Sequence, residues 1–222
     1  MDIEIFQDRI DAGKQLAKRL LSYENKAAVV LAIPRGGVPV GFEVASRLKA
    51  EFDVIIPRKL PIPWNPEAGF GAITADGTMV LNAPMVSSLG LTDEEIEQAA
   101  EEVRQEVIRR TLEYRGDRPP PNVEGRPVIL VDDGLASGYT MLAAIESVKK
   151  WSPSTIVVAI PVASKGAARL VNHSADKLVV LITSEHLPFA VANFYIKWRD
   201  LSDEEIISCL HRSLAPSVET GT

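Results

Sequence analysis

The feature that most constrains the fold is the stretch at residues 128–140, where four apolar residues lead into two carboxylates and a loop of small and hydroxyl residues. Residues 128–131 are too short for a helix and too apolar for a loop. Pro127 stands before them, where a first strand residue needs no donor, so they predict a buried strand of a parallel sheet. The apolar spacing after Thr140 predicts a helix. The stretch therefore indicates an α/β fold.

The loop in this stretch has the composition of an anion-binding turn. In open α/β sheets, ligands bind at the carboxyl ends of strands, beside the loop that enters the next helix. Its backbone N–H groups would lie at a helix N-terminus, where the dipole favours a phosphate. Ser137 and Thr140 add hydroxyl donors, and Gly138 lets the backbone approach closely. Asp132 and Asp133 are acceptors suited to a ribose diol or a divalent cation.

The whole stretch resembles the phosphoribosyl pyrophosphate signature of the type I phosphoribosyltransferases. The resemblance implies that Asp132 and Asp133 bind the ribose 2′- and 3′-hydroxyls and hold Mg²⁺ only indirectly, through those hydroxyls or water. It also implies that residues 136–140 hold the 5′-phosphate. The substrate-binding residues of the stretch are then Gly134, Leu135, Ala136, Ser137, Gly138, Tyr139 and Thr140.

Two positions depart from the family pattern, and two plainer interpretations stay open. Tyr139 replaces a small residue, which narrows the backbone angles of the loop or places a phenol at its rim. Hypoxanthine-guanine enzymes carry an aspartate at the position of Ala136, whereas adenine-type enzymes carry alanine, so purine oxo-base chemistry by that route is not expected. Without a ligand, the pattern would be a strand whose last residues cap a helix. A metal site built by Asp132 and Asp133 alone is the least favoured interpretation.

Length and composition set broad limits on the protein. The 222 residues, 46% of them hydrophobic, predict one domain over residues 1–222, with a core at about 27–182 and cap segments at about 1–26 and 183–215. The net charge of −6 argues against nucleic acid or an anionic membrane as a partner. Cys209 is the only cysteine and predicts a packed thiol in a reducing compartment, and no apolar run approaches the length of a membrane span. These features together predict a cytoplasmic protein.

A second strand-to-helix loop precedes the signature. Residues 27–33 read as a strand and residues 38–48 as a helix, so Pro34, Arg35, Gly36 and Gly37 form the connection between them. The glycines permit close backbone approach and Arg35 offers a fork for phosphate oxygens, although such a sequence alone is more often only a turn. Next to the signature, it resembles the family's pyrophosphate loop, so both loops should face one crevice.

A third cationic segment follows the next predicted strand, at residues 54–57. Arg58 and Lys59 end that strand, and residues 60–69 are too rich in proline and glycine for a regular element, so we expect a long, mobile loop there. Considered alone, Arg58 and Lys59 would be ordinary surface residues exposed to solvent. The family resemblance implies instead a flexible loop that closes over the reaction, with Arg58 and Lys59 facing the pyrophosphate.

The remaining pattern predicts a three-layer α/β/α fold with a mostly parallel sheet. Residues 70–74 and 78–82 flank a glycine-containing turn and predict a hairpin at an antiparallel edge of that sheet. Capping boxes predict helices that begin near Thr92 and Ser202. The narrow apolar stripe of the first of these helices packs on its own core or, as a second interpretation, forms a subunit interface, so a homodimer stays open.

The aromatic stretch at residues 183–198 begins at the carboxyl end of the last predicted strand and resembles the family's base-binding segment. Phe189 either stacks on a planar base or fills a cap core. The resemblance implies Mg²⁺-dependent transfer of a phosphoribosyl group from phosphoribosyl pyrophosphate to a nitrogen nucleophile, such as a nucleobase, with Arg35, Lys59, Asp132 and Asp133 as the catalytic residues. The competing hypothesis is a non-catalytic sensor, whose pocket binds the same donor or a nucleotide and regulates a partner.

Overall fold

Five apolar strands form a parallel sheet in the computed structural model, which describes residues 5–214. The strand order is β2-β1-β6-β7-β8, and each neighbouring pair runs parallel. Every residue of β1 is buried, as a sheet covered on both faces requires. The strands are β1 (Val29–Ala32), β2 (Glu51–Val54), β6 (Pro127–Val131), β7 (Thr155–Ser164) and β8 (Lys177–Ser184).

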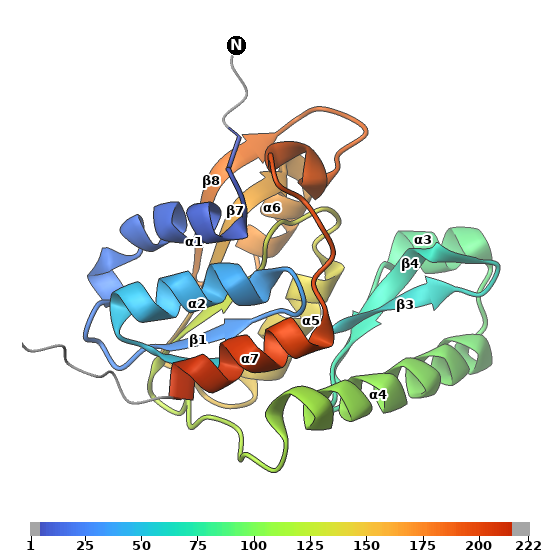
Figure 1. Cartoon of the computed structure of the whole chain (residues 1–222). Coiled ribbons are helices and arrows are strands. Elements are labelled where there is room, and N and C mark those ends of the chain that lie inside the picture. The colour runs from blue at the N-terminus through green and yellow to red at the C-terminus, as the bar shows by residue number, and fades with distance from the viewer. Residues whose placement is uncertain (1–4, 215–222) are drawn as a thin grey trace, which may run out of the picture.

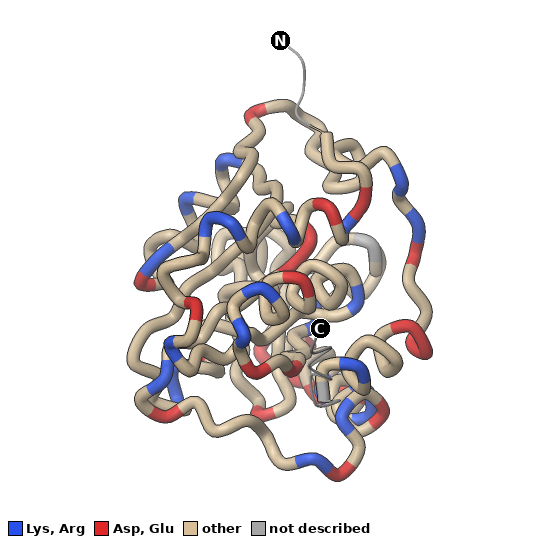
Figure 2. The backbone as a smooth tube through the Cα atoms, turned by 60° about the vertical axis from the view of Figure 1, so that its left-hand side comes forward, with Lys and Arg blue, Asp and Glu red and all other residues tan. Residues whose placement is uncertain are grey.

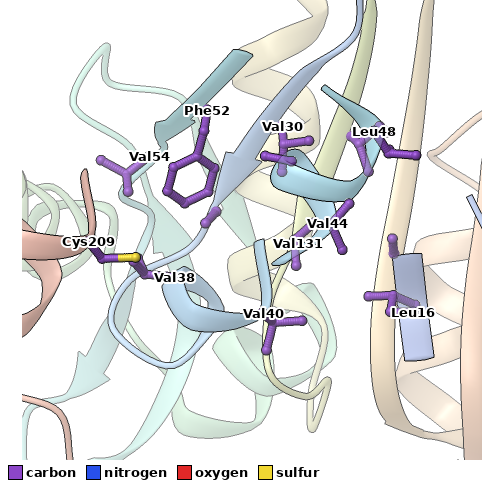
Figure 3. Packing of buried hydrophobic residues seen from close by; sticks show 14 of the residues in the cluster. Leu16, Val30, Val38, Val40, Val44, Leu48, Phe52, Val54, Val131 and Cys209 are labelled. Carbon is purple, nitrogen blue, oxygen red and sulfur yellow. The ribbon is translucent and has the colours of Figure 1, made fainter. Parts of the chain in front are cut away.

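Helices cover both faces of this sheet, which confirms the predicted three-layer α/β/α fold (Figure 1). Val30 and Ala32 of β1 pack toward one helical layer, whereas Val29 and Leu31 pack toward the other. The first layer contains α1 (Arg9–Lys18), α2 (Gly37–Leu48) and α7 (Asp203–Leu214), and the second contains α5 (Tyr139–Lys149) and α6 (Lys165–Asn172). Cys209 of α7 lies beside Val38 as a buried free thiol, as predicted (Figure 3).

A separate three-stranded antiparallel sheet stands beside the parallel one (Figure 1). It contains β3 (Arg58–Ile62), β4 (Asn65–Ile73) and β5 (Met79–Leu81), next to α3 (Ala83–Leu89) and α4 (Asp93–Arg115). The predicted hairpin therefore exists, but its placement at an edge of the parallel sheet was wrong. The physical reason is that Leu60, Phe70 and Ile96 bury one another in a core cluster of their own.

The irregular loop expected at residues 60–69 is instead most of a β-hairpin. Proline cannot donate to a ladder, but it is tolerated on edge strands and at bulges. Strand β3 is an edge strand, and its pairing with β4 shifts register on both sides of Pro61. The strand expected at residues 54–57 also lies earlier, because β2 ends at Val54.

The predicted helix boundaries agree with the side-chain caps. Thr92 and Glu95 form a reciprocal capping box at the start of α4, and Ser202 and Glu205 exchange equivalent hydrogen bonds at the start of α7. Ser164 accepts from a backbone N–H in the first turn of α6. The apolar stripe of α4 is buried within this chain at Ile96, Ala100, Val107 and Tyr114, which supports the interpretation that it packs on its own core.

Residues near the start of the described chain and residues 191–195 form a cap over the carboxyl edge of the sheet. Phe6 forms a parallel bridge with Tyr195 and packs with Phe194 next to the short helix η2 (Val191–Phe194). A second short helix, η1 (Leu21–Tyr23), follows α1. Residues 1–4 and 215–222, the outer ends of the two predicted cap segments, lie outside the described residues.

No helix within residues 5–214 is long and apolar enough to cross a membrane. Lys and Arg are interspersed with Asp and Glu along the part of the chain that faces the viewer in Figure 2. A bound anion would therefore be attracted mainly by groups close to it.

Candidate functional site

The two predicted anion loops touch each other. Strands β1 and β6 are neighbours in the sheet, so the loops that follow them emerge side by side. A Cβ added to Gly36 would lie 1.9 Å from Asp133 Oδ2, and one added to Gly37 would lie 2.7 Å from the carbonyl oxygen of Val131. Glycine is required at both positions because side-chain and backbone atoms of the second loop occupy that space. The structure therefore brings residues 34–37 and the acidic pair into one site.

The acidic pair is held by hydrogen bonds from three directions. The backbone N–H of Asp133 donates to Asp132 Oδ1 at 2.8 Å. Arg9 Nε donates to Asp133 Oδ2 at 2.7 Å, and the hydroxyl of Tyr195 donates to the carbonyl oxygen of Asp133 at 2.6 Å. Neither Arg9 nor Tyr195 was identified from the sequence, because neither lies near the signature along the chain.

The carboxyl groups of Asp132 and Asp133 repel each other when both are ionised. Burial, followed by the neighbouring charge of Asp133, raises the pKa of Asp132 well above its usual value. Burial also raises the pKa of Asp133, against the opposing effect of the Arg9 guanidinium. Two close carboxyls of this kind titrate as a pair, so ionising both of them costs free energy. Groups that donate hydrogen bonds, such as ribose hydroxyls, would offset this cost.

The signature loop is attached to the end of β7. The N–H of Leu135 donates to the carbonyl of Val162 at 2.9 Å, and the N–H of Ser164 donates back to Leu135 at 2.9 Å. Ser164 Oγ also donates to the carbonyl of Ala136 at 2.8 Å. Leu135 is buried by these contacts, whereas Ala136 and Ser137 stay exposed. A ligand can therefore reach the part of the loop expected to bind phosphate.

The loop then enters α5 through Gly138, which has a φ of 89°. Because the positive φ falls on this glycine, Tyr139 needs no unusual backbone conformation. The Tyr139 ring packs against the β6–α5 core. The first N–H groups of α5 lack intrahelical acceptors and are oriented toward the loop.

A cavity of about 310 Å³ adjoins the two loops. It brings together five of the predicted residues, Pro34, Arg35, Arg58, Lys59 and Thr140. It also contains Arg110 and Tyr114 of α4, which the sequence interpretation missed. Its complete lining is Pro34, Arg35, Ile56, Pro57, Arg58, Lys59, Arg110, Tyr114 and Thr140. The helical spacing of α4 predicted that Tyr114 is buried, but no local signal related Arg110 to the anion loops.

Carboxylates neutralise several cations of this cavity. Glu106 pairs with Arg58 at 3.1 Å and with Arg110 at 2.8 Å. Hydrogen bonds from Arg109 and Arg110 lower the pKa of Glu106 to about 2. Because Glu106 remains ionised at neutral pH, an incoming anion must compete with it for the cations.

Asp203 supplies a further negative charge at the first position of α7. It lies 3.7 Å from Arg35 and accepts a short hydrogen bond from Tyr114. Burial and this contact raise the pKa of Tyr114 to about 12, so Tyr114 keeps its proton at neutral pH. Helix α7 is therefore electrostatically connected to the first anion loop.

Val191 of the cap packs closely against Gly134 of the signature loop. A Cβ added to Gly134 would lie 2.4 Å from Val191 Cγ1. Phe189 is half-buried and lies 5.7 Å from Phe194 between ring centroids, so it contributes to the cap cluster. Stacking of Phe189 on a base stays a prediction.

The donor set of the site fits an indirectly held Mg²⁺. Within the described chain, no cluster of three or more His, Cys, Asp or Glu side chains could hold a metal ion. Asp132 and Asp133 offer carboxylate oxygens, but Arg9 already binds one of them. A magnesium ion here would need oxygens from a ligand and from water, in keeping with its preference for phosphate and water ligands.

The fold and the site together define an α/β protein with two adjacent strand-to-helix loops and an acidic pair at the carboxyl edge of a parallel sheet. The family described as phosphoribosyl transferase domain matches residues 74–195, more than half of the chain. The chain belongs to the phosphoribosyltransferase family.

Similar proteins agree with this assignment. The chain is 38% identical over 219 residues, 99% of its length, to a Mycobacterium tuberculosis protein provisionally named a phosphoribosyl transferase, and equally to its counterpart in a second strain. It spans about half, 49%, of the length of these curated relatives. The crystal structure of the protein TT1426 from Thermus thermophilus is 38% identical, with a TM-score of 0.78, and the match covers 94% of this chain and 98% of that one.

More distant solved structures share the fold alone. A hypoxanthine phosphoribosyltransferase from Staphylococcus aureus is 12% identical, with a TM-score of 0.50 over 82% of this chain and 77% of that one. A Neisseria gonorrhoeae protein solved with bound ppGpp is 16% identical, with a TM-score of 0.51 over 96% of this chain and 98% of that one.

Proposed function

We propose that this chain transfers the 5-phosphoribosyl group from phosphoribosyl pyrophosphate to a nitrogen nucleophile, with a nucleobase as the favoured acceptor, and releases pyrophosphate. The observation that carries the proposal is the contact between the two anion loops, where Gly36 leaves no room for a Cβ beside Asp133. This contact supports the proposal because it joins residues 34–37 to the acidic pair, next to a cavity lined by cations at the same edge of the sheet.

Each part of the site then has one task. Asp132 and Asp133 accept hydrogen bonds from the ribose hydroxyls, and residues 136–140 hold the 5′-phosphate through N–H groups and hydroxyls. Arg35 with its two glycines binds the pyrophosphate, together with the other cations of the cavity. These roles follow the family resemblance and the positions of the side chains.

In the reaction, the bond between the sugar carbon and the pyrophosphate oxygen breaks, a bond from that carbon to the nitrogen forms, and the nitrogen releases its proton to solvent. The electron pair of the broken bond leaves with pyrophosphate, and the sugar carbon carries positive character in the transition state. Bound Mg²⁺ would supply positive charge beside the pyrophosphate oxygens. The protein mainly orients the two reactants and neutralises the charge that accumulates on the leaving group. Ala136 offers no carboxylate at the position where some family members have an aspartate.

The direct test is pyrophosphate release. The protein is incubated with phosphoribosyl pyrophosphate, Mg²⁺ and each of a panel of purines, pyrimidines and small amines. Release with one class of nucleophile, and its loss in the Asp132→Asn, Asp133→Asn double variant, is the expected result. Tight binding of the donor without release for any nucleophile would overturn the catalytic proposal.

That outcome would favour the sensor hypothesis, in which the same pocket binds the donor or a nucleotide. The Neisseria gonorrhoeae structure with bound ppGpp makes this nucleotide a useful member of the binding panel. A homodimer also remains a proposal, which light scattering of the purified protein tests directly.

A further inference from the structure

An arginine from the other end of the chain contacts the acidic pair. Arg9 lies in the first turn of α1, 124 residues from Asp133, and Arg9 Nε approaches Asp133 Oδ2 to 2.7 Å. Both side chains are largely buried, with 10% and 13% of their surfaces exposed. A charge-assisted hydrogen bond shielded from water constrains geometry more strongly than an exposed ion pair.

Arg9 is in turn fixed by the cap. Its Nη1 donates to the carbonyl oxygen of Arg199 at 2.9 Å, and its guanidinium lies 3.9 Å from the centre of the Trp198 ring. Tyr195 packs on the same Trp198, with 5.3 Å between ring centroids, and donates its hydroxyl to the Asp133 carbonyl. The cap thus holds Asp133 at both its side chain and its backbone.

We infer that Arg9 is a positioning residue for ribose binding: through Asp133, it holds the acidic pair in the geometry that accepts the ribose hydroxyls. This inference rests on the proposed function, because it needs the acidic pair to bind ribose. Arg9 acts on the diol and not on the pyrophosphate, since the residues that line the cationic cavity do not include it.

Arginine is better suited to this position than lysine. Its planar fork donates to Asp133 and to the Arg199 carbonyl at once, while its flat face stacks on Trp198. Lysine would keep the charge but lose the fork and the stacking. A neutral side chain would leave the Asp133 carboxylate buried without its cation, free to rotate or shift against Asp132.

The test compares a ligand with a ribose and a ligand without one. Calorimetry measures binding of phosphoribosyl pyrophosphate with Mg²⁺, and separately of inorganic pyrophosphate with Mg²⁺, to Arg9→Met, Arg9→Lys and the unsubstituted chain. We expect Arg9→Met to weaken phosphoribosyl pyrophosphate binding by tenfold or more and to change pyrophosphate binding by less than twofold. Arg9→Lys should recover part of the loss. The matched control is Arg19→Met, at the exposed end of the same helix, which should change neither affinity.

Three results would contradict the inference, and each has a different meaning. Tighter binding of phosphoribosyl pyrophosphate by Arg9→Met would show that Arg9 blocks the site and must leave, and an equal loss for both ligands would show a general structural role. Either result overturns the inference, as does unchanged affinity for both ligands. Trp198→Leu, which removes the ring that Arg9 and Tyr195 both pack on but keeps the Arg9–Asp133 ion pair, should cause a smaller loss in the same direction and serves as the test if Arg9→Met does not fold.

Asp133→Asn separates this inference from the proposed function. If Asp133→Asn leaves phosphoribosyl pyrophosphate binding unchanged, the ribose role of the acidic pair fails. If Asp133→Asn weakens binding and the Arg9 variants do not, only the role of Arg9 fails.

Discussion

Arg35 lies where an extended strand meets two glycines and a helix, and it lines the cationic cavity. We predict that Arg35→Ala lowers affinity for pyrophosphate and phosphoribosyl pyrophosphate but leaves that for ribose 5-phosphate nearly unchanged. A charge-assisted hydrogen bond is worth about 1.5–3 kcal/mol, so a loss of at least about tenfold is expected. Calorimetry measures the affinity of the parent chain and of Arg35→Ala for each of the three ligands.

Arg47→Ala is the control, because Arg47 lies in the last turn of α2, the helix that follows Arg35, and pairs with Glu24. An equal loss for all three ligands would mean that Arg35 acts on the whole site or on folding. The assignment of two separate phosphate loops would then fail.

Gly36 is a second position where one residue decides the geometry of the site. A Cβ there would lie 1.9 Å from Asp133 Oδ2, so Gly36→Ala must displace the carboxylate or the loop. Overpacking of this kind costs about 1–3 kcal/mol, and we expect a lower melting temperature together with weaker phosphoribosyl pyrophosphate binding.

Gly166→Ala is its matched control, because a Cβ there would meet nothing within 4 Å and α6 favours alanine over glycine. That variant should keep or raise the melting temperature and bind the ligand normally. Normal binding by Gly36→Ala would contradict the close contact between the loops.

At the scale of elements, the β3–β4 hairpin has the properties of a movable part. Its base, at Arg58 and Lys59, lines the cationic cavity, while Trp64 at its tip is 63% exposed. Its pairing is irregular around Pro61. Strands with shifted registers and exposed hydrogen bonds open more readily than a buried central strand.

We therefore predict that amide hydrogen exchange in residues 58–73 slows when phosphoribosyl pyrophosphate and Mg²⁺ bind together. The ligand should hold the base of the hairpin through the cations and reduce its opening. Mass spectrometry of peptides from this segment measures the change, with peptides from β6 as the internal reference. Equal exchange with and without ligand would exclude closure of the hairpin.

At the scale of the whole molecule, the acidic pair should reduce the stability of the ligand-free fold. The folded-state pKa of Asp132 is raised above its unfolded value. As the pH falls through the raised pKa, the folded state takes up a proton that the unfolded state does not, so stability rises. Above that pKa, the ionised carboxyl lowers the stability of the folded state.

Asp132→Asn should therefore raise the melting temperature at pH values above the folded-state pKa, and its advantage should shrink as the pH approaches the unfolded value. The same variant should bind phosphoribosyl pyrophosphate more weakly, since active sites often trade stability for function. Thermal denaturation over a pH series measures this, with the exposed Asp117→Asn as control. A lower melting temperature for Asp132→Asn at every pH would contradict the prediction.

Local patterns in the sequence determined most of the secondary structure. The run at residues 128–140 determined a strand, a phosphate-type loop and a helix, because burial, glycine geometry and helix capping act over a few residues. The capping boxes at Thr92 and Ser202 located two helix starts for the same reason. The prediction of an irregular loop at residues 60–69 was wrong, because the effect of proline on a strand depends on whether that strand lies at the edge of a sheet.

Tertiary structure alone decided which distant groups complete the site. Nothing near Arg9 or Arg110 in the sequence relates them to the anion loops, because their partners lie on other elements. The sheet to which the hairpin belongs was equally undetermined, since local pattern predicts that two strands pair but not which core covers them. The sequence by itself determined the two strand-to-helix loops and the residue types that they carry, because these depend on neighbouring residues. Only packing between distant elements decided the cationic cavity and the arginine on the acidic pair.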